Sequence, residues 1–569
     1  MFKMQNKFMN GRPRMKLPRN SVHLILATIV INILGLAMPL MMLQTYDRIL
    51  PNHGIGSLVL LLSGVAIAAV LEVILRLARS YLTGWAGAVF EHATSYRALE
   101  HMLDADIQAF EGQGSGAYIQ KMAAISRLRM FYSGQALMTI VDLPFVLIFL
   151  ALIFYIGGNL VFVPLTLFMI FCLTAWLVGV RLKSEVIEED RNDKIRSNFL
   201  IETLTGIHSI KSQGLEQFFL RRFARLGDAI SAAHFRVALS NSLASSAGML
   251  FGQIMTISVV TFGALKVING DFGAGGLAAC LLLSGRIMQP VQRALGLWTR
   301  FQNYFVDRQE LQEIFALPVP TGKTSDSMLQ PKGIIRCTDL AFSYRASDTP
   351  LFKGLDLFLG PGSSVSLVGQ ESRGKTTFLL LLAGLMEADG GKVTIDGAEP
   401  RVVSPEERAQ RIGYLPEKGV IFNGTIMDNL TFFGAIPVDD AITAARHLGI
   451  VDGVALLPNG FKTTITDSVT DPIPPGFKQR IAIARTLARK PKVILFDNAD
   501  RGLDRQGYNL VFKVLGRLKG KVTMVFVSDD RNILRLADQE YHIVDGKLKE
   551  QPPIDSKVYS VLPFRELKV

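Results

Sequence analysis

Cysteine is scarce in this chain of 569 residues. The three cysteines, Cys172, Cys280 and Cys337, lie far apart and form neither a CxxC pair nor a spacing typical of metal sites. A disulfide-rich scaffold is therefore excluded, because such scaffolds depend on many closely spaced cysteines. We expect all three thiols to be inert packing residues.

Acidic residues are absent from the first 20 positions. Six basic residues precede the first apolar run there: Lys3, Lys7, Arg12, Arg14, Lys16 and Arg19. The formal net charge of the whole chain, +12, could by itself indicate a nucleic-acid partner. Basic residues directly before an apolar run are instead typical of the cytoplasmic side of a membrane protein. We therefore expect the chain to meet a lipid bilayer and no nucleic acid.

Charged residues are few, at 19% of the chain, whereas hydrophobic residues make up 49% and the mean hydropathy is +0.30. Such values are high for a soluble protein. Apolar segments of about 20 residues, long enough to span a bilayer, occur only in roughly the first 300 residues. The first run is too long for a signal peptide and has no small-residue cleavage site, so it should remain as a transmembrane helix. Six candidate spans can be drawn, at residues 22–45, 56–78, 132–156, 160–181, 240–268 and 274–298.

These spans predict four parts in the chain. The parts are a cytoplasmic basic segment at 1–20, a transmembrane domain at 21–315, a second domain at 333–555 and a C-terminal tail at 556–569. An even number of spans places both termini in the cytoplasm. The long charged stretches 79–129 and 183–236 are predicted helices that project from the membrane into the cytoplasm. Within the second, residues 206–223 (GIHSIKSQGLEQFFLRRF) suit either a docking tip or an ordinary amphipathic helix.

Two carboxylates fall inside the predicted spans, Glu72 in the second and Asp142 in the third. Such residues are functional candidates by default, because an unpaired carboxylate is costly to bury in a membrane. Both lie near the predicted cytoplasmic ends of their helices, where a structural pair with arginine is the more frequent arrangement. We therefore favour pairing with arginine, and a role in a transport path is the alternative.

In the second domain, short β-rich segments alternate with helical ones. Residues 334–344 (IIRCTDLAFSY) and 363–369 (SSVSLVG) are predicted strands. The segment 369–376, GQESRGKT, follows the second strand and matches G-x-x-x-x-G-K-[ST] directly before an apolar helix. Backbone N–H groups at the start of such a helix bind phosphate oxygens. Lys375 can reach the β and γ phosphates, and the Thr376 hydroxyl can ligate Mg²⁺.

A further predicted strand, KVILFD, ends in Asp497. A carboxylate in this position beside a phosphate-binding loop is of the type that holds Mg²⁺ through water. The loop and this strand together predict an α/β fold that binds ATP or GTP.

Six spans followed by such a domain resemble an ABC exporter half-transporter, and the likeness covers almost the entire chain. Tyr344 matches the aromatic residue that stacks on adenine, and Asp497 matches the Walker B aspartate. Leu503 and Asp504 match the D-loop, and residues 478–491 (KQRIAIARTLARKP) look like the helix after the ABC signature. The resemblance implies a type I ABC exporter fold: an α-helical membrane domain of six transmembrane helices, then an α/β nucleotide-binding domain.

The same resemblance implies ATP and Mg²⁺ as cofactors and identifies the residues that would bind them. Mg²⁺ would be held by Thr376, Asp497 and Glu417. The nucleotide contacts would be Tyr344, Gly369, Gln370, Glu371, Ser372, Arg373, Gly374, Lys375, Thr376 and Thr377.

Parts of the membrane domain are similar to type I secretion exporters, which move proteins or peptides. The similar stretches are residues 35–52, 139–150 and 281–302. About 20 residues precede the first span, so the layout is closer to protease and lipase exporters than to exporters with an N-terminal peptidase-like domain. The resemblance implies a bacterial inner-membrane location. It also implies an exported protein or peptide as a partner and allows a periplasmic adaptor and an outer-membrane channel.

The chain departs from the family where hydrolysis takes place. The family has Glu directly after the Walker B aspartate to activate water, whereas this chain has Asn498. An amide cannot accept a proton from water at neutral pH, and a positioned general base contributes roughly 10² to 10⁴ in rate. Asp529 replaces the switch histidine and is expected to repel the γ-phosphate. Glu417 replaces the Q-loop glutamine; it could still ligate Mg²⁺ but adds a negative charge.

The signature pentapeptide differs as well. In an ABC dimer the family's LSGGQ sequence contacts the γ-phosphate of the other subunit's site through a serine hydroxyl and backbone N–H groups. Pro474 removes that hydroxyl, and neither it nor Pro475 has a backbone donor. In the phosphate loop, Ser372 and Arg373 replace a small or glycine pair. The pentapeptide here is Ile473, Pro474, Pro475, Gly476 and Phe477, in which only Gly476 is retained.

These changes predict a subunit that binds ATP but hydrolyses it weakly by itself, although the family is an ATPase of the translocase class. ABC sites combine motifs from two subunits, so a homodimer would carry two altered sites. A heterodimer with a catalytic second half-transporter is therefore favoured. Two alternatives stay open: a non-translocating, ATP-gated membrane scaffold or regulator, and a homodimeric exporter with slow, atypical hydrolysis.

Overall fold

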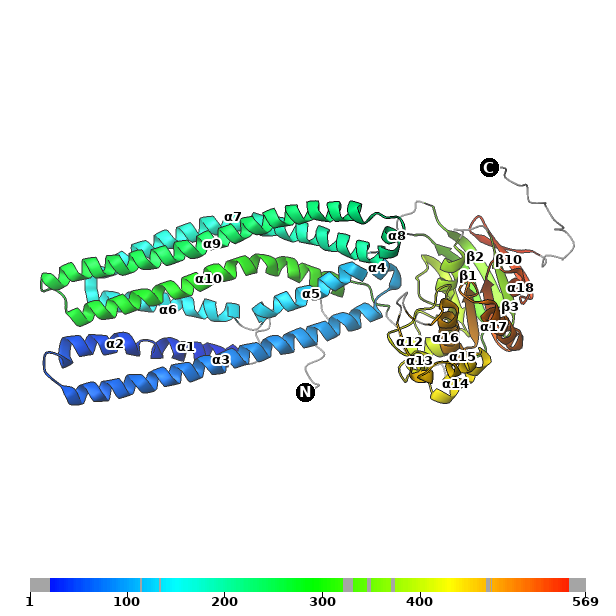
Figure 1. The fold of residues 1–569 in the computed structure, drawn as a ribbon, viewed down its shortest axis with the longest axis horizontal. Helices are drawn as coiled ribbons and strands as arrows, with labels where there is room; N and C mark the ends of the chain where they lie inside the picture. Colours follow the sequence, from blue (N-terminus) through cyan, green and yellow to red (C-terminus); the bar gives the residue numbers. More distant parts are fainter. Residues whose placement is uncertain are drawn as a thin grey trace. The chain divides into compact units, whose positions relative to one another are not determined.

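The computed structural model describes residues 21–112, 115–132, 135–320, 331–344, 349–369, 374–466, 471 and 473–551 (Figure 1). The chain divides into two compact units. The first unit contains the chain up to Asp104 together with Phe110–Leu317, and the second contains Ala105–Ala109 together with the chain from Pro318 onward. The change at Leu317 falls between the two predicted domain ranges.

The first unit is built from long helices. Helix α7 lies along α9, α6 lies along α10, and α1 packs against α3 (Figure 1). The helices of this part of the chain are α1 (Ser21–Leu34), α2 (Ala37–Gln44), the π-helix η2 (Thr45–Ile49), α3 (Ile55–Asp104), α4 (Ile107–Glu111), α5 (Ser115–Tyr132), α6 (Gln135–Gly157), the 3₁₀ helix η3 (Gly158–Val161), α7 (Phe162–Thr205), α8 (Ile207–Ser212), α9 (Glu216–Ile268) and α10 (Ala274–Phe315).

A core of apolar side chains joins α6, α9 and α10. It includes Phe149, Ile153, Val259, Leu283 and Ile287, each at most 2% exposed. Lipid-facing and core-facing positions are both apolar in a membrane helix, so hydrophobicity alone could not separate them in the sequence. The packing of the helices makes that distinction.

Four stretches of described helix are long and apolar enough to cross a membrane: Val22–Ile49, Ile55–Asp104, Met138–Thr205 and Glu216–Ile268. Since Met138–Thr205 includes most of α6 and all of α7, these stretches overlap five of the six predicted spans. The sixth predicted span, 274–298, corresponds to the first part of α10 and is not one of the four stretches. The side chains of residues 291–303 lie outside the described part.

The two carboxylates in the predicted spans both have polar partners. Arg76 Nη2 donates to Glu72 Oε1 at 2.5 Å, one helical turn away, so the prediction of a pair with arginine is confirmed for Glu72. Asp142 is 3% exposed, and its Oδ1 accepts a hydrogen bond from Asn32 Nδ2 at 2.8 Å. Both contacts lower the cost of burying a carboxylate in apolar surroundings.

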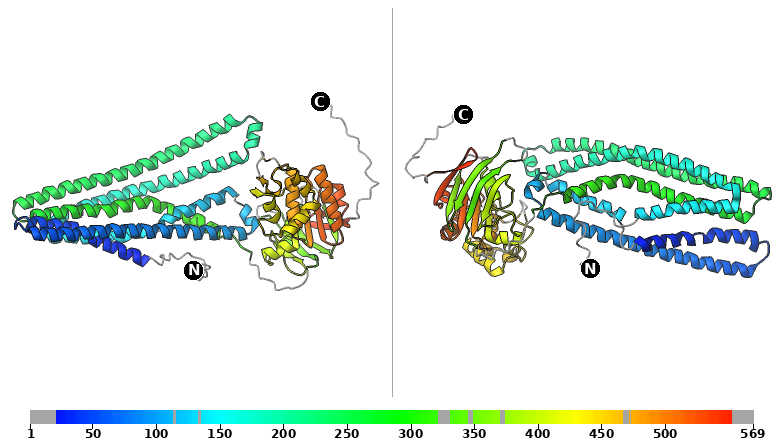
Figure 2. Two further views of the ribbon diagram at one scale, coloured as in Figure 1. Left: turned by 60° about the horizontal axis from the view of Figure 1, so that its bottom comes forward. Right: turned by 180° about the vertical axis from the view of Figure 1, so that it is seen from behind.

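The second unit is an α/β structure with three sheets (Figure 2). A six-stranded sheet has the order β11-β10-β3-β9-β8-β5 and is parallel except for the β10–β11 pair. A three-stranded antiparallel sheet has the order β2-β1-β4, and β6 pairs with β7. The strands are β1 (Ile335–Phe342), β2 (Phe352–Leu359), β3 (Ser364–Val368), β4 (Gly390–Ile395), β5 (Ile412–Leu415), β6 (Gly424–Thr425), β7 (Thr464–Ile465), β8 (Val493–Asp497), β9 (Thr523–Val527), β10 (Gln539–Val544) and β11 (Lys547–Gln551).

Side chains alternate between two cores across the central strands. Phe496 of β8 and Phe526 of β9 enter one core with α13, α14, α16 and α17, whereas Leu495 and Val525 enter the other with α11 and the three-stranded sheet. Every residue of β8 and β9 is buried, as expected for parallel strands covered on both faces. The helices of this unit are α11 (Lys375–Leu382), α12 (Pro405–Arg411), α13 (Ile426–Thr431), α14 (Val438–His447), α15 (Ile450–Ala455), the 3₁₀ helix η4 (Gly460–Lys462), α16 (Pro475–Leu487), α17 (Arg505–Leu518) and α18 (Arg531–Leu534).

The short segment Ala105–Ala109 belongs to the second unit although it follows α3 directly in the chain. Its Asp106 is 7% exposed and forms an ion pair with Arg401, with 2.7 Å between Asp106 Oδ2 and Arg401 Nη2. The backbone N–H of Asp106 donates to the Pro318 carbonyl at 2.9 Å. The sequence did not single out this segment. The predicted docking tip at 206–223 contains α8 and the start of α9, and its docking role stays a prediction.

Replacing Phe526 with Ala is expected to lower the free energy of unfolding of the α/β unit by about 3–5 kcal/mol, because a fully buried aromatic ring leaves a cavity. Thermal unfolding of the full-length protein in detergent measures the effect. Phe358→Ala is the matched control, since this ring is 58% exposed, and it should cost about 1 kcal/mol or less. Equal losses from the two substitutions would contradict the described core.

Candidate functional site

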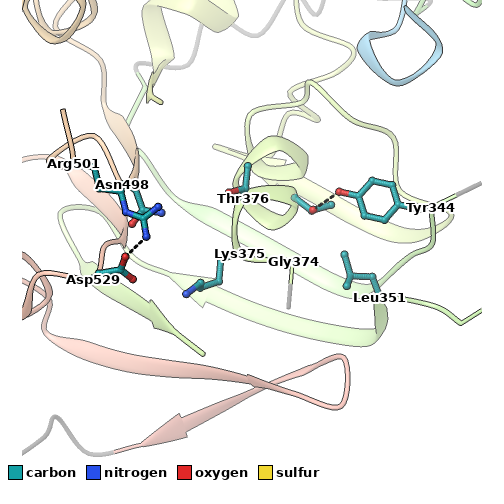
Figure 3. Close-up of a pocket in the computed structure, with 9 residues that line it drawn as sticks. Tyr344, Leu351, Gly374, Lys375, Thr376, Asn498, Arg501 and Asp529 are labelled. Atoms are coloured by element: carbon teal, nitrogen blue, oxygen red, sulfur yellow. Dashed lines mark hydrogen bonds and ion pairs between the residues drawn. The ribbon is translucent and has the colours of Figure 1, made fainter. Parts of the chain in front are cut away.

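A cavity of about 560 Å³ lies at one edge of the six-stranded sheet (Figure 3). It forms where the parallel strands β3, β8 and β9 end, because the carboxyl ends of parallel strands meet at one edge and leave a crevice for a ligand. The described residues that line it are Tyr344, Leu351, Gly374, Lys375, Thr376, Thr377, Asn498, Arg501 and Asp529.

The described end of the phosphate-binding segment, Gly374 to Thr377, lines this cavity at the start of α11. Lys375 begins the helix and its Nζ donates to the Gly369 carbonyl at 2.9 Å. Gly374 has a φ of +85°, and a Cβ at this position would approach the Leu351 side chain to 2.7 Å, so the turn requires glycine. The predicted contacts Gln370, Glu371, Ser372 and Arg373 lie outside the described residues. The described part supplies the helix start and the lysine that phosphate binding needs.

Tyr344 lies on the opposite side of the cavity from Asn498, Arg501 and Asp529 (Figure 3). Its hydroxyl forms a hydrogen bond with Thr377 Oγ1 at 2.6 Å, and its side chain is 44% exposed. An anchored ring with one free surface can stack on a flat base. Lys375 lies between the two sides in this view, so the cavity can hold a base at one end and phosphates at the other.

The hydroxyl groups of Thr376 and Tyr414 both donate hydrogen bonds to Asp497 beside the loop. Thr376 Oγ1 donates to Asp497 Oδ1 at 3.1 Å, and the Tyr414 hydroxyl donates to Asp497 Oδ2 at 2.9 Å. Burial raises the pKa of Asp497, whereas the two hydrogen bonds lower it. Burial and the nearby carboxylate also raise the pKa of Tyr414, which keeps its hydroxyl a donor.

Thr376 and Asp497 fit Mg²⁺, a hard cation that proteins of this kind hold through one or two side chains, phosphate oxygens and water. The third predicted ligand, Glu417, is paired with a cation in this structure: its Oε1 accepts a hydrogen bond from Arg501 Nη1 at 3.0 Å. No cluster of three or more His, Cys, Asp or Glu side chains suited to a metal occurs in the described ranges. Nucleotide oxygens and water would complete the coordination.

Asn498 follows β8 with a φ of +49°, a left-handed conformation that asparagine tolerates better than most residues. Its backbone N–H donates to the Val527 carbonyl at 2.8 Å. Its Oδ1 is buried and has no hydrogen-bond partner among the described residues. Asn498 thus lines the cavity, while its amide oxygen is a buried acceptor without a partner.

Asp529 also lines the cavity, but its carboxylate is not a lone negative charge. Arg501 Nη2 forms an ion pair with Asp529 Oδ2 (Figure 3), and Nη1 of the same guanidinium is paired with Glu417. Hydrogen bonds to Glu417 and then Asp529 raise the pKa of Arg501, so the guanidinium stays charged. The expectation that Asp529 repels a γ-phosphate stays a prediction, to which the structure adds that Arg501 offsets part of the carboxylate's charge.

The signature segment exposes only its two prolines. Pro474 is the N-cap and Pro475 the first residue of α16, a position where proline's missing N–H costs no helical hydrogen bond. Ile473 and Phe477 are buried in the core, at 4% and 8% exposure. The exposed surface of this segment, formed by the two prolines, thus offers a ligand neither a hydroxyl group nor a backbone N–H.

Gly476 is required by close packing inside its own chain. A Cβ at this position would lie 2.9 Å from the Asp504 backbone nitrogen and 3.2 Å from the Gly502 carbonyl oxygen. The predicted D-loop therefore lies directly against the signature segment. This contact explains the glycine without any ligand.

Three important residues were missed in the sequence. Tyr414 donates a hydrogen bond to Asp497, and Arg501 pairs with Glu417 and Asp529, two residues that differ from the family's motifs. Gln479 is 5% exposed; its Oε1 accepts from the Gly419 N–H at 2.7 Å and its Nε2 donates to two carbonyls at 3.1 Å. The sequence did offer one signal for Arg501. A basic residue stands between Asn498 and Asp504 in a chain where Glu417 and Asp529 add two negative charges to the family's motifs.

Two family models match the chain. The ABC transporter transmembrane region matches residues 22–291, and the ABC transporter model matches residues 352–501. Among solved structures, a bacterial Atm1-family ABC exporter with ATP bound is similar with a TM-score of 0.78 and 18% identity, covering 94% of each chain. At this identity the likeness establishes the fold alone.

Curated relatives are similar over most of the chain. The alpha-hemolysin translocation ATP-binding protein HlyB of Escherichia coli O157:H7 is 26% identical, with 94% of this chain and 76% of the relative covered. The leukotoxin export ATP-binding protein LtxB of Aggregatibacter actinomycetemcomitans is 26% identical, with 93% and 75% covered. The cyclolysin secretion/processing ATP-binding protein CyaB of Bordetella pertussis strain Tohama I is 26% identical, with 92% and 74% covered.

Replacing Gly476 with Ala is expected to lower the free energy of unfolding by about 1–3 kcal/mol, because the added methyl group would press on the backbone of Asp504. The matched control is Gly516→Ala in α17, where a Cβ meets nothing within 4 Å. The control should be neutral or stabilising, since alanine favours a helix. Thermal unfolding of both full-length variants checks this, and an unchanged Gly476→Ala protein would contradict the packing described.

Proposed function

The chain belongs to the ABC transporters, with an exporter-type transmembrane domain followed by a nucleotide-binding domain, and on this basis we propose that it is the ATP-binding subunit of a type I secretion-like exporter. Its substrate would be a protein or peptide. The names of the similar proteins, which refer to hemolysin translocation, leukotoxin export and cyclolysin secretion, support this substrate class.

The observation that carries the proposal is the convergence of Lys375, Thr376 and Asp497 at the edge of the parallel sheet. Lys375 and the start of α11 would bind the phosphates of ATP, and Tyr344 would stack on the adenine. Thr376 and Asp497 would hold Mg²⁺, which supplies charge neutralisation to the phosphates when it is bound. This chain's own residues thus suffice for nucleotide binding.

Hydrolysis by this chain alone is proposed to be weak. Asn498 stands where the family has the general base, and an amide cannot take the proton of a water molecule. Asp529 is a carboxylate paired with Arg501 and cannot act as the switch histidine does in the family. Pro474 and Pro475 cannot donate to a γ-phosphate across a dimer interface.

A second ABC half-transporter with intact motifs would be the natural partner. One composite site would then combine Asn498 and Asp529 with the partner's signature, and the other would combine the partner's general base with Ile473–Phe477. We propose that the second site turns over and that the first holds ATP as a clamp. Both sets of replacements lie in one chain, so neither site of the heterodimer would be fully equipped.

The surroundings of the exporter follow from the same family. We propose an inner-membrane location with both termini in the cytoplasm, which the apolar helices of the first unit support. We also propose that the exporter acts together with a periplasmic adaptor and an outer-membrane channel. A non-translocating ATP-gated scaffold would share the nucleotide site, so hydrolysis and transport measurements are needed to separate the two functions.

Purified alone in detergent, the full-length protein is expected to bind ATP but to hydrolyse it only slightly above a Lys375→Ala variant, because it lacks a general base. Phosphate release measures turnover, and the signal should rise when a second half-transporter with intact Glu, His and LSGGQ is added. Robust turnover by the chain alone, lost in Lys375→Ala, would refute weak hydrolysis. A complex that binds ATP but never turns over or transports would favour the scaffold.

Restoring the altered motifs should restore catalysis. The triple variant Asn498→Glu/Asp529→His/Pro474→Ser is expected to hydrolyse ATP roughly 10²-fold faster than the parent, because a positioned general base contributes at least that much. The matched control replaces Asn498 with Gln in the same background, which keeps the size of Glu but not its basicity. If the Glu and Gln variants hydrolyse ATP equally slowly, loss of the base is not what limits the parent.

A further inference from the structure

Three charged residues from separate segments meet at one end of the nucleotide cavity. Arg501 follows β8 and is paired with Glu417, which is 84 positions earlier, and with Asp529, which is 28 positions later. Each carboxylate stands where the family has a neutral or basic side chain. The positive charge of Arg501 is therefore paired with both negative charges that this chain adds to the family's motifs, Glu417 and Asp529.

The guanidinium is accessible from the cavity. The Arg501 side chain is 42% exposed and lines the cavity together with Lys375 and Asn498. A guanidinium has five N–H donors in a planar fork, and the two ion pairs engage one donor on each terminal nitrogen. Donors thus remain for a further anion.

The position of Arg501 specifies which part of a nucleotide it would meet. In Figure 3 it lies with Asn498 and Asp529 on the side opposite Tyr344, and Lys375 lies between. A base on Tyr344 would place its phosphate chain along Lys375, with the last phosphate nearest Arg501. Arg501 and Lys375 are the cations among the described residues that line the cavity.

A purely structural role explains the cluster poorly. Arg501, Glu417 and Asp529 are each about half exposed, and ion pairs in such surroundings contribute little to stability. However, the two carboxylates hold the Arg501 guanidinium from two sides and so fix its orientation before a ligand arrives. Arginine in a fixed fork is suited to bidentate recognition of phosphate.

We propose that Arg501 recognises the terminal phosphate of a nucleoside triphosphate and so distinguishes ATP from ADP in this site. Glu417 and Asp529 act as positioning residues that hold the guanidinium and compete with the phosphate for it. This inference rests on the proposed function, because it requires that nucleotide binds in this cavity. It adds a residue of the same chain as the triphosphate sensor, where the family uses the switch histidine and the partner's signature.

Binding to the full-length protein in detergent tests the proposal, with Mg²⁺ and displacement of a fluorescent nucleotide by AMP-PNP or ADP. AMP-PNP is used because it is not hydrolysed. Arg501→Ala is expected to weaken AMP-PNP binding by about tenfold and ADP binding by less than about twofold. Arg501→Lys should fall between the parent and Arg501→Ala, because it keeps the charge but loses the fork. Arg517→Ala, an exposed arginine of α17 outside the cavity, should change neither affinity.

A second set of variants separates direct contact from simple neutralisation of the carboxylates. Glu417→Gln/Asp529→Asn should bind AMP-PNP more tightly than the parent, because losing two negative charges that repel the phosphate and compete for Arg501 outweighs the looser hold on the guanidinium. Adding Arg501→Ala to that pair should again lower AMP-PNP affinity by about tenfold with little change for ADP. If the triple variant keeps the discrimination of the double variant, Arg501 serves only to offset its two neighbours and the proposal is wrong.

The outcomes also separate this inference from the proposed function. An equal loss of AMP-PNP and ADP binding in Arg501→Ala, or no loss at all, would contradict the inference and leave nucleotide binding intact. Failure of the parent protein to bind either nucleotide, with the same result for Lys375→Ala, would contradict nucleotide binding and with it the role of Arg501.

Discussion

Strands β3, β9 and β8 lie side by side in the middle of the six-stranded sheet, and their parallel main-chain hydrogen bonds set where Lys375, Asn498 and Asp529 lie in the cavity. Asp497 is opposite Val527 in this register, so the residues that follow them, Asn498 and Asp529, emerge at the same edge. Strand β3 ends at this edge with Val368, just before the phosphate-binding segment. A one-residue slip would exchange the two buried cores and move these side chains away from one another. Burial on both faces of β8 and β9 prevents such a slip.

Charge balance in the cavity depends on the same convergence. Taken separately, Glu417 and Asp529 each add a negative charge where phosphates would bind, which favours repulsion. Arg501 comes from a third segment and pairs with both. At the end of the cavity farthest from Tyr344, Asp529 and Arg501 line the wall, and Glu417 is linked to them through Arg501. Replacements that look independent along the chain form one electrostatic unit in the fold.

The signature segment shows that a family residue can be kept for an internal reason. Gly476 lies so close to Gly502 and Asp504 that a side chain would overlap their backbone. The neighbouring prolines begin α16 favourably, and Phe477 joins the core. Packing within the subunit and recognition of a second subunit's nucleotide are therefore separable requirements. This chain meets the first with residues that lack the donors needed for the second.

The sequence by itself was sufficient for the two-part architecture and the phosphate-binding loop, because apolar length and the glycine-lysine spacing are local signals, whereas the exporter fold was implied by its resemblance to a known family. It also indicated Asp497, Asn498 and the altered signature. Tertiary structure alone decided the pairing of Arg501 with Glu417 and Asp529, the hydrogen bond of Tyr414 to Asp497, and the inclusion of Asp106 in the second unit. These contacts join residues far apart in sequence, and no periodic or spaced pattern along the chain encodes which charged side chains will meet when strands align.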